Sequence, residues 1–275
     1  MIIIKIFLDT ANISELRKGM EAGVLDGCTT NPSLIKAEVD REKKAGRKID
    51  LDGQIEEICR TLGKGRPVSL EVFSTDSESM VKEGELLYKR FNPIANNVFV
   101  KIPVNTSVDG KDNSHGLKAI KILSDKGIPI NTTLIMTPEQ ALLSAKAGAK
   151  IVSPFAGRID DYIRTKAGTK FEKDDYFPAD GTGKDDNGIV SGVDLVKKIV
   201  EIFGVHKIKT EVLAGSIRNA RQARELALVG ADIATMPFHA LNDMLKHEKT
   251  VEGTIKFSQD TVEEYRNVFR IKPKK

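Results

Sequence analysis

The segment 98–104, Val-Phe-Val-Lys-Ile-Pro-Val, limits most strongly what this chain can fold into. Its β-branched and aromatic residues are typical of a strand, and Pro103 should lie at or near the end of that strand. Because side chains alternate along a strand, Phe99 and Lys101 share one face and the aliphatic residues share the other. Burial of a charged lysine is costly unless it is paired, and a neutral lysine is a nucleophile toward carbonyl carbon. Taken alone, the segment is equally compatible with an edge strand that holds Lys101 in water.

The length and composition fit one domain over residues 1–275. Of its 275 residues, 40% are hydrophobic and 30% are charged, which indicates a globular protein with a large core. No apolar run approaches the roughly 18 residues that cross a membrane, and the apolar start lacks the basic region and cleavage site of a signal peptide. Cys28 and Cys59 are the only cysteines, so we expect no disulfide framework, no zinc site and a cytoplasmic location. The net charge is only +4, and the basic end, 270–275, is expected to be a solvated tail.

Strand-like runs alternate with helical patterns throughout the chain, which is typical of parallel βαβ units. The predicted strands are 5–9, 27–30, 67–72, 98–104, 129–135, 151–156, 207–214 and 232–237. This alternation predicts an α/β protein, a closed (β/α)8 TIM barrel with an extra C-terminal helix. A doubly wound open sheet is the alternative, and the absence of Gly-x-Gly-x-x-Gly after the first strand weakens it.

Helical patterns fill most of the intervals between these strands. The predicted helices are 13–22, 54–62, 77–91, 113–126, 138–148, 193–203, 218–229, 239–247 and 251–269. The highly charged stretch 37–53 shows little apolar periodicity, and we expect an inserted surface loop that could include a helical turn. The stretch 162–191 is rich in Gly, Asp and Lys and is expected to be a second, irregular insertion. Its Gly-rich part, 181–188, lacks the spacing of a phosphate-binding P-loop, so nucleotide binding is not expected.

Polar residues interrupt the apolar strands in a regular way. Parallel barrel strands are buried on both faces and should be apolar, yet Asp9, Glu71 and Lys101 lie near the carboxyl ends of three of them. Strands five and six carry further polar residues with the same one-face pattern, Asn131, Thr133 and Ser153. If these faces point inward, the side chains converge at the end of the barrel where barrel enzymes hold their active sites. One hydroxyl could merely satisfy the backbone, whereas three buried charges require a joint explanation.

The three charged residues suit Schiff-base chemistry. Lys101 can form an imine with a ketone, and the cationic nitrogen then acts as an electron sink for cleavage of a neighbouring carbon–carbon bond. Asp9 and Glu71 are candidates for the proton transfers. Burial disfavours a lysine ammonium and neighbouring carboxylates favour it, so the residue types leave its protonation state open.

Other residues are suited to binding a hydroxylated, phosphorylated substrate. Thr133 could hold a water between Glu71 and the reacting centre, and amides such as Asn31 could bind hydroxyl groups. Arg158 and Arg218 lie just past strands six and seven, a region that commonly binds phosphate in barrels. Arginine suits phosphate because it forms bidentate pairs.

Six motifs together resemble the transaldolase family, most closely its short subfamily, which also contains fructose-6-phosphate aldolases. They are FLDTAN at 7–12, TTNPSL at 29–34, VKIP at 100–103, NTTL at 131–134, VSPFAGR at 152–158 and AGSIRN at 214–219. The resemblance implies a class I mechanism with no cofactor and no metal. It also implies transfer of a three-carbon ketol unit from sedoheptulose 7-phosphate to glyceraldehyde 3-phosphate, in the pentose phosphate pathway.

The resemblance assigns roles to individual residues. Lys101 would be the Schiff-base lysine, Asp9 would transfer a proton during bond cleavage, and Glu71 with Thr133 would hold the catalytic water. The substrate-binding set would comprise Asn31, Asn131 and Ser153 for the dihydroxyacetone unit, Phe155, and Arg158, Ser216 and Arg218 for the sugar phosphate. The aldolase branch carries glutamine at the position of Glu71 and tyrosine at that of Phe155, so the residues here favour the transferase.

Two features depart from the short subfamily, whose members typically lack the segments 37–53 and 162–191. The second segment could form a flap over the phosphate end or an inter-subunit contact. The resemblance implies a homo-oligomer, a pentamer or decamer, in which the terminal helix 251–269 packs on a neighbour.

Three other readings of the chain stay open from sequence alone. The first is a related Schiff-base aldolase acting on fructose 6-phosphate or deoxyribose 5-phosphate. The second is a sugar-phosphate-binding barrel without catalysis, although binding alone needs no imine-forming lysine. Nucleic-acid binding is the third, and no motif or aromatic platform supports it.

Overall fold

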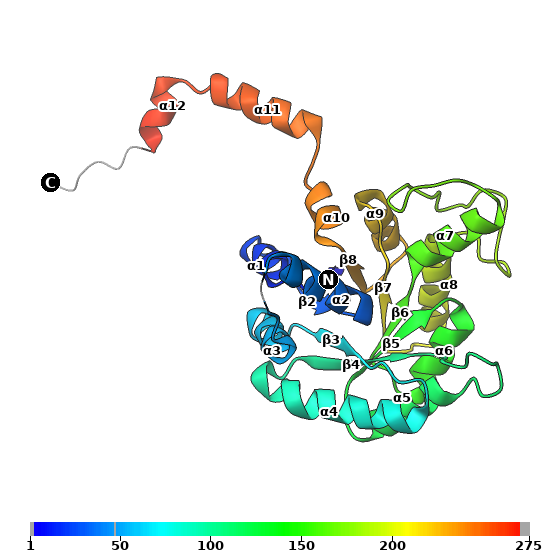
Figure 1. Ribbon diagram of the computed structural model, residues 1–275. Coiled ribbons are helices and arrows are strands. Elements are labelled where there is room, and N and C mark those ends of the chain that lie inside the picture. Colours follow the sequence, from blue (N-terminus) through cyan, green and yellow to red (C-terminus); the bar gives the residue numbers. More distant parts are fainter. Residues whose placement is uncertain (1–2, 47, 270–275) are drawn as a thin grey trace.

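The computed structural model describes residues 3–46 and 48–269, and its centre is a closed barrel of eight parallel strands (Figure 1). The strands pair in chain order, and the last pairs with the first. They are β1 Lys5–Asp9, β2 Gly27–Thr29, β3 Val68–Glu71, β4 Val98–Pro103, β5 Ile130–Ile135, β6 Ile151–Pro154, β7 Glu211–Ala214 and β8 Ile233–Met236. Each lies inside a predicted strand, which confirms the (β/α)8 TIM barrel and excludes the open sheet.

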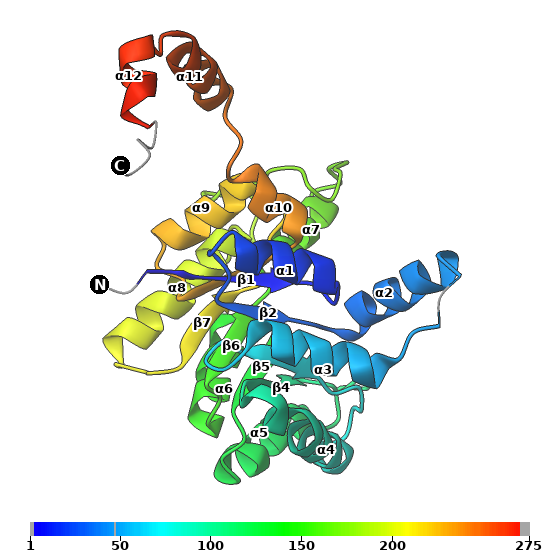
Figure 2. The ribbon, with the colours of Figure 1, turned by 90° about the vertical axis from the view of Figure 1, so that its left-hand side faces the viewer.

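Helices follow the strands, and most of them cover the outside of the barrel (Figures 1 and 2). They are α1 Ile13–Glu21, α2 Pro32–Lys44, α3 Leu51–Leu62, α4 Ser77–Ala95, α5 His115–Asp125, α6 Pro138–Ala147, α7 Ala156–Lys166, α8 Gly192–Val205, α9 Ala220–Leu228, α10 Phe238–Asp243, α11 Glu248–Gln259 and α12 Glu263–Val268. Within the described ranges, none of these helices has both the length and the apolar character that crossing a membrane requires.

The interior of the barrel has an apolar floor and a polar upper layer. The floor is a cluster of inward-facing side chains, Phe7, Phe99, Ile151, Leu213 and Ile233. Side chains two positions further along each strand face the same lumen, nearer the carboxyl ends. The register places Lys101 beside Glu71 of β3 and Asn131 of β5. The polar residues that share one face of each predicted strand therefore form the upper layer of the lumen.

The lumen also explains a glycine on β2. A Cβ built on Gly27 would lie 2.4 Å from the ring of Phe7, far inside van der Waals contact. Only a residue without a side chain fits at this point, because the Phe7 ring fills the floor beside it.

The prediction of a surface loop over 37–53 was wrong, because α2 and the start of α3 occupy most of this stretch. Asn31 caps α2 by accepting a hydrogen bond from the backbone N–H of Leu34 at 3.0 Å. Ion pairs one turn apart, such as Lys36 with Asp40 at 2.6 Å, lie along its exposed side. A helix held by a cap and by surface pairs buries little apolar area, so apolar periodicity gave no sign of it.

The second predicted insertion begins later than expected. The helix α7 continues to Lys166 because Ile159 and Ile163 bury one of its faces. The remainder, 167–191, contains no helix or strand apart from one isolated bridge between Asp186 and Ile189. This remainder is named the α7–α8 segment below.

The C-terminal helices α11 and α12 project away from the barrel (Figures 1 and 2). The prediction of one helix over 251–269 was wrong, because the helical backbone is interrupted between Asp260, the C-cap of α11, and Val262, the N-cap of α12. Two consecutive β-branched residues follow Asp260, and the Thr261 hydroxyl bonds back to the carbonyl oxygen of Phe257 at 2.7 Å. The predicted solvated tail, 270–275, lies outside the described residues.

Candidate active site

Lys101 lies at the centre of the upper lumen, with only 3% of its surface exposed. Its Nζ is 3.0 Å from Oε2 of Glu71 and donates to the carbonyl oxygen of Thr30 at 3.1 Å. The Phe155 ring centroid lies 5.8 Å from the same nitrogen. A closed barrel has no edge strand, so Lys101 cannot be a solvated edge residue. The carboxylate partner compensates the burial of its charge.

Asp9 lies on β1 and accepts a hydrogen bond from Thr29, whose hydroxyl also contacts that of Thr235. The Thr29 hydroxyl donates to Oδ1 of Asp9 at 2.7 Å, and the Thr235 hydroxyl lies 2.7 Å from that of Thr29. This chain of hydroxyls fixes the carboxylate within the lumen. The sequence analysis missed both threonines as site residues. They occupy the inward face of β2 and β8, and this strand parity was the signal that could have found them.

Asn131 and Ser153 form a buried chain of hydrogen bonds. The Ser153 hydroxyl donates to Oδ1 of Asn131 at 2.6 Å, and Nδ2 of Asn131 donates to the Ser69 hydroxyl at 3.0 Å. The two bonds fix which way the amide points. Both predicted substrate-binding residues are therefore rigidly placed beside Lys101.

Thr133 is fully buried, and its hydroxyl has no hydrogen-bond partner within the described part of the chain. The next residue, Leu134, has φ 58°, and the β5–β6 register shifts at this point. Left-handed backbone is costly for a branched side chain, and such strain commonly occurs at functional sites. No hydrogen bond joins Glu71 to Thr133 among the described residues. An orphaned buried hydroxyl suits a site where a water or substrate group binds.

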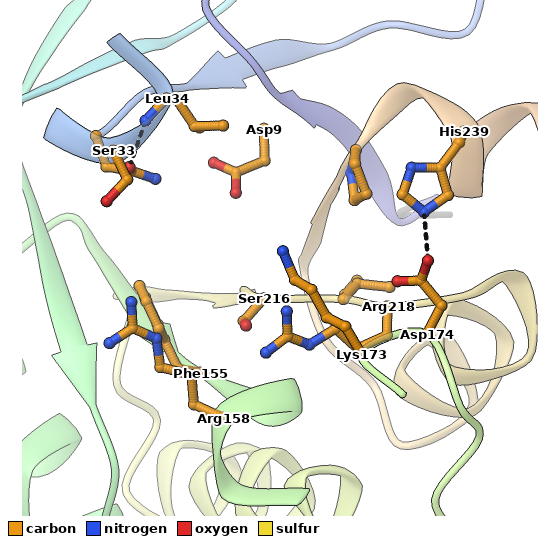
Figure 3. Close-up of a pocket in the computed structure, with 13 residues that line it drawn as sticks. Asp9, Ser33, Leu34, Phe155, Arg158, Lys173, Asp174, Ser216, Arg218 and His239 are labelled. Carbon is orange, nitrogen blue, oxygen red and sulfur yellow. Dashed lines mark hydrogen bonds and ion pairs between the residues drawn. The ribbon is translucent and has the colours of Figure 1, made fainter. Parts of the chain in front are cut away.

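Two cavities that share lining residues lead down to Lys101. The inner cavity, about 10 Å³, has room for about one water and is lined by Asp9, Thr29, Asn31, Lys101, Ser153, Phe155, Leu213, Gly215, Ser216 and Thr235. The outer cavity, about 420 Å³, is lined in part by Asp9, Asn31, Phe155 and Ser216 as well (Figure 3). The site is therefore a funnel with the lysine at its narrow end.

Two arginines lie at the mouth of this funnel (Figure 3). Nη2 of Arg218 pairs with Oδ2 of Asp161 at 2.5 Å, and its backbone N–H donates to Oε1 of Gln222 at 2.8 Å. Arg158 is exposed and stacks over the Phe155 ring at 5.3 Å. It has no carboxylate partner among the described residues.

The approach of Ser216 and Arg218 to α7 depends on Gly157. A Cβ at this position would lie 2.1 Å from the carbonyl oxygen of Ser216 and 2.5 Å from Nε of Arg218. Ser216 itself has φ 60°, another strained position. Gly157 therefore allows the loop after β7 to close on the first turn of α7.

Asn31 has two roles because its amide has two ends. Its Oδ1 caps α2, and its Nδ2 has no hydrogen-bond partner within residues 3–46 and 48–269. The side chain lines both cavities. The cap thus fixes the amide with its donor end available to a substrate.

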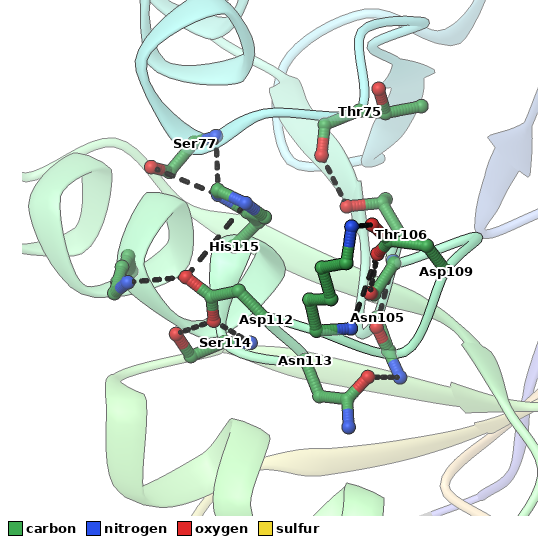
Figure 4. Close-up of polar contacts among 12 residues, drawn as sticks. Thr75, Ser77, Asn105, Thr106, Asp109, Asp112, Asn113, Ser114 and His115 are labelled. Atoms are coloured by element: carbon green, nitrogen blue, oxygen red, sulfur yellow. Dashed lines mark hydrogen bonds and ion pairs between the residues drawn. The ribbon is translucent and has the colours of Figure 1, made fainter.

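The loops after β3 and β4, the strands that carry Glu71 and Lys101, are fastened to each other (Figure 4). The backbone N–H of Ser77 donates to Nδ1 of His115 at 3.3 Å, and the Thr106 hydroxyl donates to the carbonyl oxygen of Thr75. These bonds stabilise the rim next to the lysine.

All the residues predicted for the site lie at this end of the barrel. Most of them line the cavities, namely Asp9, Asn31, Lys101, Ser153, Phe155, Arg158, Ser216 and Arg218. Glu71 and Asn131 contact Lys101 and Ser153, and Thr133 is paired in register with Pro103. Besides the threonines, the sequence analysis missed rim residues at helix starts and on the α7–α8 segment, namely Ser33, His239, Lys173 and Asp174. In the portion of the chain that is described, no three His, Cys, Asp or Glu side chains gather as a metal-binding group.

Known proteins are similar in sequence to this chain over nearly its full length. Residues 6–272 match the model of the Transaldolase/Fructose-6-phosphate aldolase family. A protein named "Probable transaldolase 1" from Bacillus cereus ATCC 14579 is 40% identical over 256 residues, covering 93% of this chain and 96% of that protein. "Probable transaldolase" from Clostridium perfringens strain 13 is 39% identical over 256 residues, with the same coverage of both chains.

A solved structure, titled a (putative) lactate oxidase of Pediococcus acidilactici, refolded wild type, aligns with a TM-score of 0.49 and 14% identity. The alignment covers 85% of this chain and 62% of that one. The family match and the relatives agree with the six sequence motifs, and the chain belongs to the transaldolase/fructose-6-phosphate aldolase family.

Proposed function

We propose that the protein is a transaldolase that moves a dihydroxyacetone unit from sedoheptulose 7-phosphate to glyceraldehyde 3-phosphate through a Schiff base on Lys101. One observation carries the proposal: a buried lysine, 3.0 Å from a carboxylate, lies at the narrow end of a funnel that Asp9 also lines. The names of the relatives and the two mouth arginines support the substrate class.

The first half of the reaction breaks the donor ketose. Glu71 accepts a proton from the ammonium of Lys101, and the neutral Nζ attacks the ketone carbon at C2. Loss of water gives an iminium ion. Asp9 removes the proton of the C4 hydroxyl, the C3–C4 bond breaks, and its electron pair moves to the iminium. A four-carbon aldose phosphate leaves, and a three-carbon enamine stays on Lys101.

The second half forms the product on the same residues. The enamine carbon attacks the aldehyde of glyceraldehyde 3-phosphate, and Asp9 returns its proton to the new alkoxide. Water, held by Glu71 and Thr133, then attacks the iminium and releases a six-carbon ketose phosphate together with free Lys101. The orphaned hydroxyl of Thr133 supports this water-binding role.

Transfer requires that the enamine outlive the departure of the first product. The aromatic ring of Phe155 lies 5.8 Å from Nζ of Lys101 and offers no hydroxyl group near the bound carbon. A proton donor at this place would convert the enamine to dihydroxyacetone and make the protein an aldolase. Phe155 therefore favours an acceptor aldehyde over a proton.

The setting of the protein is part of the proposal. We place it in the cytoplasm, in the pentose phosphate pathway, as a homo-oligomer. The assembly is supported by α11 and α12, which expose Val251, Ile255, Phe257, Val262, Tyr265 and Val268. Isolated helices this short are marginal in water, so a packing partner is expected.

Product analysis with both sugar phosphates tests the function. We expect six-carbon ketose phosphate to form much faster than free dihydroxyacetone. Glu71→Gln should slow transfer about 100-fold or more, the range for loss of a positioned acid or base, while Glu78→Gln on the exposed side of α4 should leave it unchanged. Donor consumption with only dihydroxyacetone released would identify an aldolase instead. Normal transfer by Glu71→Gln would remove Glu71 from the mechanism.

A further inference from the structure

The α7–α8 segment is fastened over the mouth of the funnel. Arg164, only 6% exposed, stacks against the rings of Phe171 and Phe177 at 4.8 and 5.1 Å. Its Nη2 donates to the carbonyl oxygen of Asp175 at 2.8 Å. The residues on either side of Lys173 are thus anchored to α7.

The same segment is also anchored to α9. The Tyr176 hydroxyl donates to Oε1 of Glu225 at 2.9 Å, and the Arg221 guanidinium lies 3.6 Å from the Tyr176 ring centroid. Nδ2 of Asn219 donates to the carbonyl oxygen of Asp174 at 3.1 Å. The backbone at Lys173 is therefore held in place between two helices of the barrel.

Lys173 lines the outer cavity beside Arg158 and Arg218 (Figure 3). Its side chain is exposed, and no carboxylate pairs with it among the described residues. The neighbouring Asp174 faces His239 instead, with Oδ2 3.8 Å from Nε2. Lys173 and Arg158 are thus the unpaired cations of this mouth, as far as the described chain shows.

The charges at the mouth indicate why a third cation is needed. A phosphate monoester carries about −1.5 to −2 charges at pH 7. Arg218 is already paired with Asp161 at 2.5 Å, so the two arginines together offer only one uncompensated positive charge. Lys173 supplies a second positive charge, while the neighbouring carboxylate of Asp174 faces His239.

We propose that Lys173 is a specificity-determining residue that binds the phosphate group of the sugar-phosphate substrates together with Arg158 and Arg218. This inference rests on the proposed function and extends it to a residue outside the barrel's strands and helices. The α7–α8 segment then serves to place a phosphate-binding residue, Lys173, at the mouth. Because the lysine is exposed, its contribution is electrostatic and weakens as salt concentration rises.

Inorganic phosphate binding by the full chain tests the proposal without any turnover. At low ionic strength, Lys173→Met should weaken phosphate binding about tenfold in calorimetric titration, equivalent to about 1.4 kcal/mol. Lys173→Arg should bind as the wild type does. Lys170→Met is the matched control, because Lys170 is on the same segment but lines a different cavity. Equal weakening by Lys170→Met, or no weakening by Lys173→Met, overturns the proposal.

Steady-state kinetics add a readout of specificity. Lys173→Met should raise KM for glyceraldehyde 3-phosphate about tenfold at nearly unchanged kcat, and leave unphosphorylated glyceraldehyde unaffected. An equal rise for both aldehydes contradicts the role. If the wild type shows no transfer at all but Lys173→Met still loses phosphate affinity, the proposed function fails and the phosphate site stands.

Discussion

At the residue scale, burial and pairing together decide what the polar lumen can do. Lys101 has a carboxylate and a backbone carbonyl as partners and lies beside an aromatic ring. Its position places Nζ where a carbonyl carbon at the narrow end of the funnel would meet it. In the mechanism proposed above, Glu71 is both the ion-pair partner of Lys101 and the base that frees its amine for attack.

A second buried carboxylate, Asp160 on α7, is linked through Gln222 to the mouth arginine Arg218. It accepts hydrogen bonds from the backbone N–H of Gly192 and from Nε2 of Gln222, both at 2.7 Å. Gln222 in turn accepts from the backbone N–H of Arg218. Burial raises the pKa of Asp160 from its ordinary 3.8 to about 7, against the opposing effects of these bonds and of Arg164.

The raised pKa of Asp160 makes folding stability depend on pH. A folded-state pKa above the unfolded one means that the native state binds the proton more tightly. The associated stability is complete below pH 3.8 and is lost as pH rises through about 7. The loss is at most about 4 kcal/mol, since the two pKa values differ by about three and each counts about 1.4 kcal/mol.

Unfolding free energies at pH 5 and pH 8 check this expectation. The wild type should be less stable at pH 8, and Asp160→Asn should show a smaller decrease. The variant should also be less stable at both pH values, because an amide cannot accept from both Gly192 and Gln222. Asp232, whose pKa burial also raises, leaves a residual slope in both proteins. An equal decrease in unfolding free energy between pH 5 and pH 8 in the two proteins would show that ionisation of Asp160 does not destabilise the fold.

Residue-scale prediction from the sequence succeeded where strand parity applies. Asp9, Glu71, Lys101 and Asn131 could be placed in the lumen because alternation fixes which face each side chain occupies. Thr29 and Thr235 obey the same rule, but a hydroxyl on a strand has so many ordinary uses that it gave no signal. Lys173 lies on a segment without periodicity, and only the fold reveals that it reaches the mouth.

At the element scale, the ends of helices build much of the site. Asn31 is the clearest case, since one side chain caps α2 with its oxygen and presents its nitrogen to both cavities. The first turn of α7 carries Arg158 and, through Gly157, admits the loop that bears Ser216 and Arg218. The residues at these helix starts therefore stabilise the helices and also line the cavities.

Substitutions at Asn31 separate its two roles. Asn31→Asp keeps a capping oxygen, so stability should be unchanged, but it removes the amide donor and should raise KM for the donor ketose about tenfold. Asn31→Ala should show the same KM rise and also lose about 1 kcal/mol of stability. Thermal unfolding and donor-saturation kinetics measure the two effects.

Asn12, the cap of α1, is the matched control for this pair. Asn12→Asp should preserve both stability and KM. Unchanged KM in Asn31→Asp would mean that the amide of Asn31 only caps the helix.

Element-scale prediction failed wherever apolar periodicity was the wrong signal. The helix α2 is held by its cap and by surface ion pairs, and so it resembled a charged loop. By contrast, α12 looked continuous with α11 because apolar residues recur through 251–269, while the break at 260–262 depends on local backbone hydrogen bonding. Every strand was found, because burial on both faces leaves short, mainly apolar runs that recur between the helical patterns.

At the scale of the whole molecule, the barrel is closed while α11 and α12 project away from it (Figures 1 and 2). Neither helix has a buried residue in the structure described here. Their apolar side chains are the molecular basis for the proposed homo-oligomer, since burial of each would contribute about 1.5–3 kcal/mol.

The assembly can be tested on the α11 surface. Wild-type protein should sediment as a pentamer or decamer, whereas the double variant Val251→Glu, Ile255→Glu should sediment as single chains. Lys256→Glu on the same helix is the control for charge alone and should leave the assembly intact. A wild-type protein that sediments as a monomer would contradict the proposal.

The measurement that tests the account most directly is borohydride trapping with fructose 6-phosphate, followed by peptide mass mapping. Reduction of the iminium intermediate should leave a stable adduct on Lys101 and on no other lysine. Lys101→Ala should abolish both the adduct and turnover, while Lys170→Met should retain both. An adduct on a different lysine, or turnover by Lys101→Ala, would contradict the central claim.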